Sequence, residues 1–116
     1  MRVLAAVLTL AAAPAIAQDW KSHSGDEAFD AETLTARLSG QTLTFYDDGR
    51  SVYDSNGEYQ YIYGGGGTWY GHWAVADNSR VCVTFVTGVE RCDRFVTNGD
   101  RLVLQTADGM RFPIRP

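Results

Sequence analysis

From residue 41 onward, the chain consists of short runs rich in Val, Thr, Tyr, Phe and Trp, separated by turn signals. The signals include Asp47-Asp48-Gly49, Ser55-Asn56-Gly57 and Asn98-Gly99. Within the runs, apolar and polar residues alternate with the two-residue period of a half-buried strand. This pattern is typical of an antiparallel meander. It predicts eight strands, at residues 42–46, 50–54, 58–63, 68–76, 80–86, 89–97, 101–106 and 110–114.

Eight short strands would leave long unpaired edges if the sheet stayed flat. The fold class that we expect is therefore mainly β, a small antiparallel meander forming a closed or nearly closed barrel, preceded by one short helix. An open, strongly bent sheet packed on that helix is the alternative. Barrels of this size are either filled by their own side chains or leave room for one small guest.

A short helix is expected ahead of the strands. Asp30 is a good N-cap and Gly40 a suitable stop. Between them, Ala31, Leu34 and Leu38 form one apolar stripe. Such a stripe lets a helix lie on a sheet.

The first residues have the pattern of an export signal. Arg2 gives a positive start, an apolar run covers residues 3–13, and Pro14 breaks it before Ala15-Ile16-Ala17. Small residues at these last positions favour cleavage after Ala17. The run is shorter than the roughly 20 apolar residues of a membrane span. The protein is therefore expected to be periplasmic or secreted, without a stable membrane anchor.

Composition sets the domain organisation and excludes some partners. The 116 residues are 45% hydrophobic and 21% charged, which fits one folded domain. After the signal peptide at 1–17, the polar segment 18–28 is expected to be a loose arm, and 29–116 a single domain. The formal net charge is −4, so the chain lacks the basic surface of a nucleic-acid binder.

The two cysteines predict a disulfide. A location outside the cytosol is oxidising and favours disulfide formation. If Val86-Thr87-Gly88 is a three-residue hairpin loop with Gly88 in the left-handed position, the register sets Cys82 directly opposite Cys92. Neither a C-x-x-C spacing nor a neighbouring base supports a redox role.

No catalytic or metal site stands out, and no cofactor is expected. His72 lies within a predicted strand, but the chain has no H-x-H or Cys/His cluster that could bind a metal. We expect His72 to be exposed or at the rim. No serine lies in a G-x-S-x-G elbow. Acid–base chemistry would need carboxylates to meet at a barrel mouth, and the candidates are Asp47, Asp48, Asp54, Glu58 and Asp77.

Aromatic residues are the most suggestive feature of the chain. Four of them, on one face of neighbouring strands, are expected to fill the core: Tyr59, Tyr61, Trp69 and Trp73. The glycine run 64–67 is either a flexible loop at a site entrance or a low-complexity linker. Near it, an exposed binding patch is expected from Tyr46, Tyr53, Tyr63, Tyr70 and His72.

Several segments together form a pattern that extends over most of the chain after the signal. They are the residues 38–43 (LSGQTL), 53–57 (YDSNG), 71–75 (GHWAV), 80–83 (RVCV), 90–92 (ERC) and 108–109 (DG). This pattern resembles a family of small exported alphaproteobacterial proteins of uncharacterised function. The resemblance implies a helix leading a β-meander with a disulfide, and no catalytic residues. The glycine run and the tyrosine row lie outside the pattern.

The leading hypothesis is a non-enzymatic periplasmic binding module. It would present its aromatic surface to a protein, a glycan or a small apolar ligand. One alternative is a periplasmic protein inhibitor of an envelope hydrolase such as lysozyme, by analogy of fold. Another is a small hydrolase that uses carboxylates and His72.

Overall fold

The computed structural model describes residues 20–116, so the predicted signal peptide, residues 1–17, lies outside the described residues. The described part is mainly β, with one short helix, and every predicted strand is found to within two residues at either end. The elements are β1 (Asp26–Ala28), α1 (Ala31–Leu38), β2 (Gln41–Thr44), β3 (Arg50–Tyr53), β4 (Glu58–Ile62), β5 (Thr68–Ala76), β6 (Arg80–Phe85), β7 (Glu90–Asn98), β8 (Arg101–Gln105) and β9 (Arg111–Pro113).

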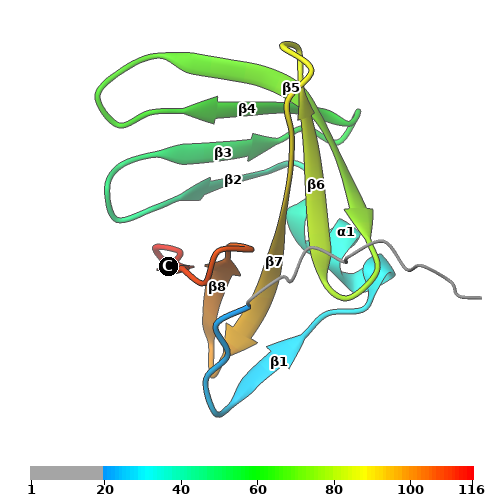
Figure 1. Ribbon diagram of the computed structural model, residues 1–116, viewed down its shortest axis with the longest axis vertical. Coiled ribbons are helices and arrows are strands. Elements are labelled where there is room, and N and C mark those ends of the chain that lie inside the picture. Colours follow the sequence, from blue (N-terminus) through cyan, green and yellow to red (C-terminus); the bar gives the residue numbers. More distant parts are fainter. Residues whose placement is uncertain (1–19) are drawn as a thin grey trace, which may run out of the picture.

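Strands β2 to β9 pair in chain order as an antiparallel meander, which curls into a half-barrel (Figure 1). The predicted closure is wrong, because the half-barrel stays open. Its two edges touch at a single bridge between Phe45 and Ile114, beside which the Arg115 amide donates to the Thr44 carbonyl (2.9 Å). The edge strands have only four and three residues, and this bridge lies just beyond the end of each of them. The bent open sheet is therefore the correct alternative.

The sheet curls mainly at β5. This strand joins the half of the sheet that ends in β4 to the half that begins with β6. Its first residues pair with β4 and its last residues with β6, and the two pairings overlap at Gly71 and His72. A side chain at Gly71 would approach the Thr84 carbonyl oxygen to 2.5 Å. Glycine therefore permits the close backbone approach that the bend requires.

The helix forms as its sequence predicts. Asp30 caps it, since the Thr33 amide donates to the Asp30 carboxylate (2.7 Å). Leu34 and Leu38 are fully buried, whereas Ala31, expected on the same stripe, is exposed. The helix packs against β5 and β2 and covers one end of the half-barrel.

The core lies on the inner face of the curled sheet. Tyr59 is buried as predicted, and Tyr61 and Trp73 pack partly buried against the core. Trp69 is 42% exposed, which corrects its prediction as a core residue. The reason is its place near the start of β5, at the end of the half-barrel away from the helix. The other buried sheet residues of the core are Phe45, Tyr53, Val81, Val83, Phe95, Leu102, Leu104 and Ile114.

The predicted disulfide is confirmed. Cys82 and Cys92 are directly opposite each other in the β6–β7 hairpin and are bonded. Gly88 has the expected positive φ of 92°. The hairpin loop and the cysteine register therefore agree, as their spacing in the sequence predicts.

Reducing this disulfide is expected to lower the free energy of unfolding by about 2–3 kcal/mol, because the crosslink limits the unfolded chain. In a domain of this size, that corresponds to a melting temperature lower by about 10 °C or more. Thermal melts with and without a phosphine reductant measure it. A variant with both cysteines changed to serine is the control, and it should melt identically in the two buffers. An unchanged melt of the wild type would show that the crosslink does not stabilise the fold.

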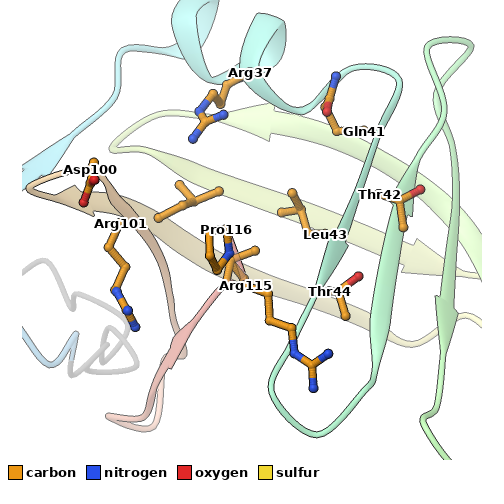
Figure 2. A pocket seen from close by; sticks show the side chains of 11 residues that line it. Arg37, Gln41, Thr42, Leu43, Thr44, Asp100, Arg101, Arg115 and Pro116 are labelled. Atoms are coloured by element: carbon orange, nitrogen blue, oxygen red, sulfur yellow. The ribbon is translucent and has the colours of Figure 1, made fainter.

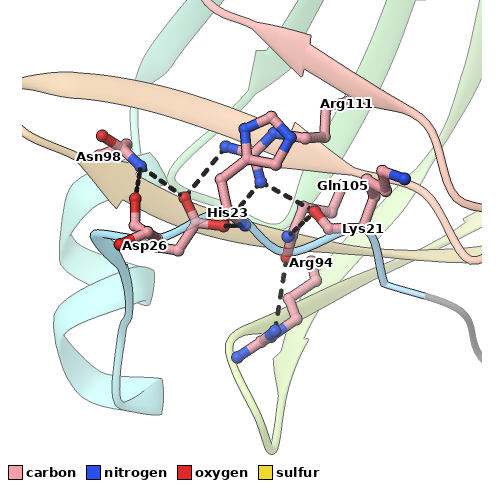
Figure 3. A network of polar contacts seen from close by, with 8 residues as sticks. Lys21, His23, Asp26, Arg94, Asn98, Gln105 and Arg111 are labelled. Atoms are coloured by element: carbon pink, nitrogen blue, oxygen red, sulfur yellow. Dashed lines mark hydrogen bonds and ion pairs between the residues drawn. The ribbon is translucent and has the colours of Figure 1, made fainter.

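The N-terminal arm, expected to be loose, is held in place from residue 20 onward. Strand β1 lies within it and pairs with β7, with Asp26 opposite Asn98. Figure 3 shows the side chains that fix the arm: Arg111 donates to both carboxylate oxygens of Asp26 (2.6 and 3.0 Å). Arg111 and Gln105 also donate to the Lys21 carbonyl, at 2.8 and 2.7 Å. The arm is therefore part of the domain.

Candidate functional site

The predicted binding patch is only partly exposed. Tyr46, Tyr63 and Tyr70 are about half-exposed, as expected, but Tyr53 is buried, at 3%. Tyr53 packs edge-on against Trp73, with 5.3 Å between ring centroids. The alternation of β3 turns Tyr53 to the inner face together with Ser51, which removes it from the surface.

The remaining members of the patch lie in three different surroundings. Tyr70 and His72 share the outer face of β5, next to a shallow depression of about 170 Å³ that Glu58 also lines. Tyr46 lies under the guanidinium of Arg115, 5.6 Å from the ring centroid. Tyr63 lies at the β4–β5 turn, edge-on to Tyr61. The aromatic surface is therefore divided among separate sites.

The glycine run, expected to be an entrance loop or a linker, lies in the turn between β4 and β5. It forms a tight turn in which the Gly66 amide donates to the Tyr63 carbonyl, and the Tyr63 amide to Gly67, both at 3.0 Å. Gly64 lies directly against Asp47, where a side chain would collide with the backbone. The run therefore packs the β4–β5 turn against the β2–β3 turn.

The candidate acid–base residues are dispersed over three turns. Asp47 and Asp48 lie in the β2–β3 turn, where Asp47 accepts from the Gly49 amide (2.8 Å) and Asp48 pairs with Arg115. Asp77 lies in the β5–β6 turn. His72 is exposed, as predicted, with Glu58 opposite it on β4. Among residues 20–116, no three His, Cys, Asp or Glu side chains are placed to hold a metal ion.

The inner face also carries a charged pair that was not predicted from the sequence. Arg91 and Asp93 lie opposite Val83 and Val81, so they share the face of the core. The Arg91 guanidinium donates to both oxygens of Asp93, from Nε at 2.8 Å and from Nη2 at 3.2 Å. A signal for this pair was present, because the register that sets the cysteines opposite each other also turns these two residues inward.

The two charges experience different surroundings. The Asp93 side chain is 14% exposed, and this burial raises the pKa of its carboxyl, against the opposing pull of Arg91. The Arg91 side chain is 53% exposed, and its hydrogen bonds to Asp93 raise the pKa of the guanidinium. Arg91 Nη1 makes no hydrogen bond within the described part of the chain. Its two N–H groups therefore donate to no described residue.

Aromatic rings lie on the same face as this pair. Burial raises the pKa of Tyr59 to about 12, and its hydroxyl shares a hydrogen bond with Ser51 (2.8 Å). Phe85 contacts both Tyr59 and Trp69 edge-on, with centroids 6.0 and 5.4 Å apart. Tyr61 lies opposite Trp69 on β4. We call the set the inner-face site, which consists of Tyr59, Tyr61, Trp69, Phe85, Arg91 and Asp93.

Comparison of the chain with protein-family models, curated proteins and solved structures gives no match. No helix within residues 20–116 is long and apolar enough to cross a membrane.

The inner-face site combines two kinds of contact. The exposed ring of Trp69 offers a flat apolar surface, and Arg91 offers hydrogen-bond donors to an acceptor. Both oxygens of Asp93 already accept from Arg91. The site is thus equipped to bind an amphipathic molecule, and its one carboxylate is engaged in holding Arg91 in place.

Proposed function

We propose that the protein is an exported, non-enzymatic binding module whose inner-face site binds a glycan. The observation that carries this proposal is the half-exposed Trp69 on the same concave face as the half-exposed Arg91. A sugar ring has an apolar C–H face that stacks on an aromatic ring, and hydroxyl or acetamide oxygens that accept from a guanidinium. The mouth of a half-barrel is a common place for such a site.

The non-enzymatic part of the proposal has its own support. A general acid or base must be within reach of the reacting group and able to exchange a proton with it. Asp93 is the carboxylate of the site, and Arg91 binds it through both oxygens. A carboxylate held in this way positions its partner and contributes no acid–base step.

Calorimetric titration with a soluble trimer of β-1,4-linked N-acetylglucosamine, and with solubilised peptidoglycan fragments, tests the proposal. We expect the wild type to bind at least one of them, and Trp69→Ala to bind it about fivefold more weakly, because a stacking ring contributes about 1 kcal/mol. Tyr70→Ala is the matched control, since Tyr70 is the adjacent residue on the outer face. It should bind as the wild type does.

Two results would contradict the proposal. One is the absence of binding to every glycan in the titrations. The other is equal weakening by Trp69→Ala and Tyr70→Ala, which would place the ligand away from the inner face. Circular dichroism of each variant shows that the fold is intact.

A further inference from the structure

A cleft of about 600 Å³ follows the seam where the half-barrel fails to close (Figure 2). One wall is strand β2, residues 41–44, and the other is the beginning of β8, at Arg101 and Leu102. The last turn of α1 contributes Arg37, and the end of the chain contributes Arg115. The seam cleft lies on a different part of the sheet from the inner-face site.

The β2 edge that faces the seam cleft carries backbone groups that have no partner within residues 20–116. The Thr44 carbonyl accepts from the Arg115 amide across the seam, so Thr44 faces this edge. In an antiparallel strand, every second residue turns its N–H and C=O to the same edge. Thr42 therefore faces the seam too, and no backbone group among residues 20–116 reaches it from across the seam. Such an edge is a template for an added strand.

The charge of the seam cleft selects its occupant. Figure 2 shows Arg37, Arg101 and Arg115 around the cleft. Arg115 is paired with Asp48 (2.8 Å), and Asp100 is the acidic side chain among the described lining residues. Within the described residues, neither Arg37 nor Arg101 forms an ion pair. This positive cluster stands out in a chain of net charge −4. A second copy of the chain would bring its own arginines against these, whereas an acidic segment complements them.

The side chains of the cleft fit an alternating pattern. Leu43, Leu102 and Ile114 belong to the inner face of the sheet and form an apolar strip along the seam. Arg101 and Arg115 are their neighbours in sequence and face outward. Because side chains of a strand alternate between faces, a strand in the seam would place apolar residues inward and acidic residues outward.

We propose that the seam cleft binds an extended, acidic segment of a partner protein, which adds as a strand beside β2 and closes the half-barrel. Main-chain hydrogen bonds to Thr42 provide the pairing, and Arg37 and Arg101 provide the preference for acidic side chains. This proposal does not depend on glycan binding. Trp69→Ala should leave the binding of the acidic segment to the seam cleft unchanged.

The test uses the whole protein with a synthetic hexapeptide of alternating glutamate and valine, followed by amide NMR. We expect the peptide to shift the amide resonances of Thr42 and Leu43 and to slow hydrogen exchange at Thr42. A hexapeptide of alternating lysine and valine should bind at least tenfold more weakly. Arg101→Glu should reverse this preference between the two peptides. Arg50→Glu, at an exposed arginine on β3 outside the cleft, is the control and should keep it.

Three outcomes would overturn the proposal. The first is no binding of the acidic peptide. The second is binding outside the seam by charge attraction. It would be seen as binding without any change at Thr42, or as equal weakening by Arg101→Glu and Arg50→Glu. The third is protection of Thr42 that grows with protein concentration in the absence of peptide, which would assign the seam to a second copy of the chain.

Discussion

Replacing Gly71 by alanine is expected to lower the free energy of unfolding by about 3 kcal/mol, at the upper end of the cost of overpacking. The added methyl group would lie 2.5 Å from the Thr84 carbonyl oxygen and 3.0 Å from the Phe85 Cα, both backbone atoms that cannot turn aside. Either the β5–β6 pairing loosens or the bend in β5 opens. Urea denaturation followed by circular dichroism measures the loss.

Gly65→Ala is the control for this substitution. Gly65 lies in the glycine run, has no atom within 4 Å of the added carbon, and does not have a positive φ. Its replacement should change the unfolding free energy by less than about 0.5 kcal/mol. If the two alanine variants were equally stable, the close approach at Gly71 would not be what bends the sheet.

Replacing Asp26 by alanine is expected to cost about 2–3 kcal/mol at pH 7, because it leaves Arg111 with little exposure and without its carboxylate partner. The Arg111 hydrogen bonds hold the pKa of Asp26 far below its usual range. A carboxyl group with a lowered pKa stabilises the fold above its unfolded pKa of about 4. This stabilisation is lost as the pH falls toward the folded pKa.

The pH dependence distinguishes this charge effect from simple loss of packing. Urea unfolding at several pH values between 7 and 2.5 should show the wild type losing its advantage over Asp26→Ala below pH 4. Glu27→Gln, at the exposed neighbour of Asp26 in β1, is the matched control and should follow the wild type. A constant difference between wild type and Asp26→Ala at all pH values would rule out the ion pair as its source.

The strands and the helix could be predicted because local chemistry determines them. Turn residues such as Gly88 fix the hairpin register, and the register then determines the Cys82–Cys92 pair. The same alternation places Arg91 and Asp93 on the inner face, so this part of the candidate site was within reach of sequence reasoning. What made it easy to miss is that charged residues are usually expected outside.

Two features could not be predicted in this way: whether the sheet closes, and that the N-terminal arm is held against the domain. Closure depends on the summed twist and bend of eight strands, to which the close approach at Gly71 contributes. The arm is held by contacts such as Asp26–Arg111, whose members are 85 residues apart in the chain. Tyr53 and Trp69 both follow the alternation of the inner face. They differ in burial because other elements cover only one end of that face.

The half-barrel is open along β2, which leaves the seam cleft and the inner face accessible. Amide hydrogen exchange of the protein alone tests this opening at two adjacent residues. The Leu43 amide faces β3 and should be protected, whereas the Thr42 amide faces the seam and should exchange nearly as fast as in an unstructured peptide. Protection of Thr42 as strong as that of Leu43 would mean that the barrel is closed along β2, which would contradict the open seam.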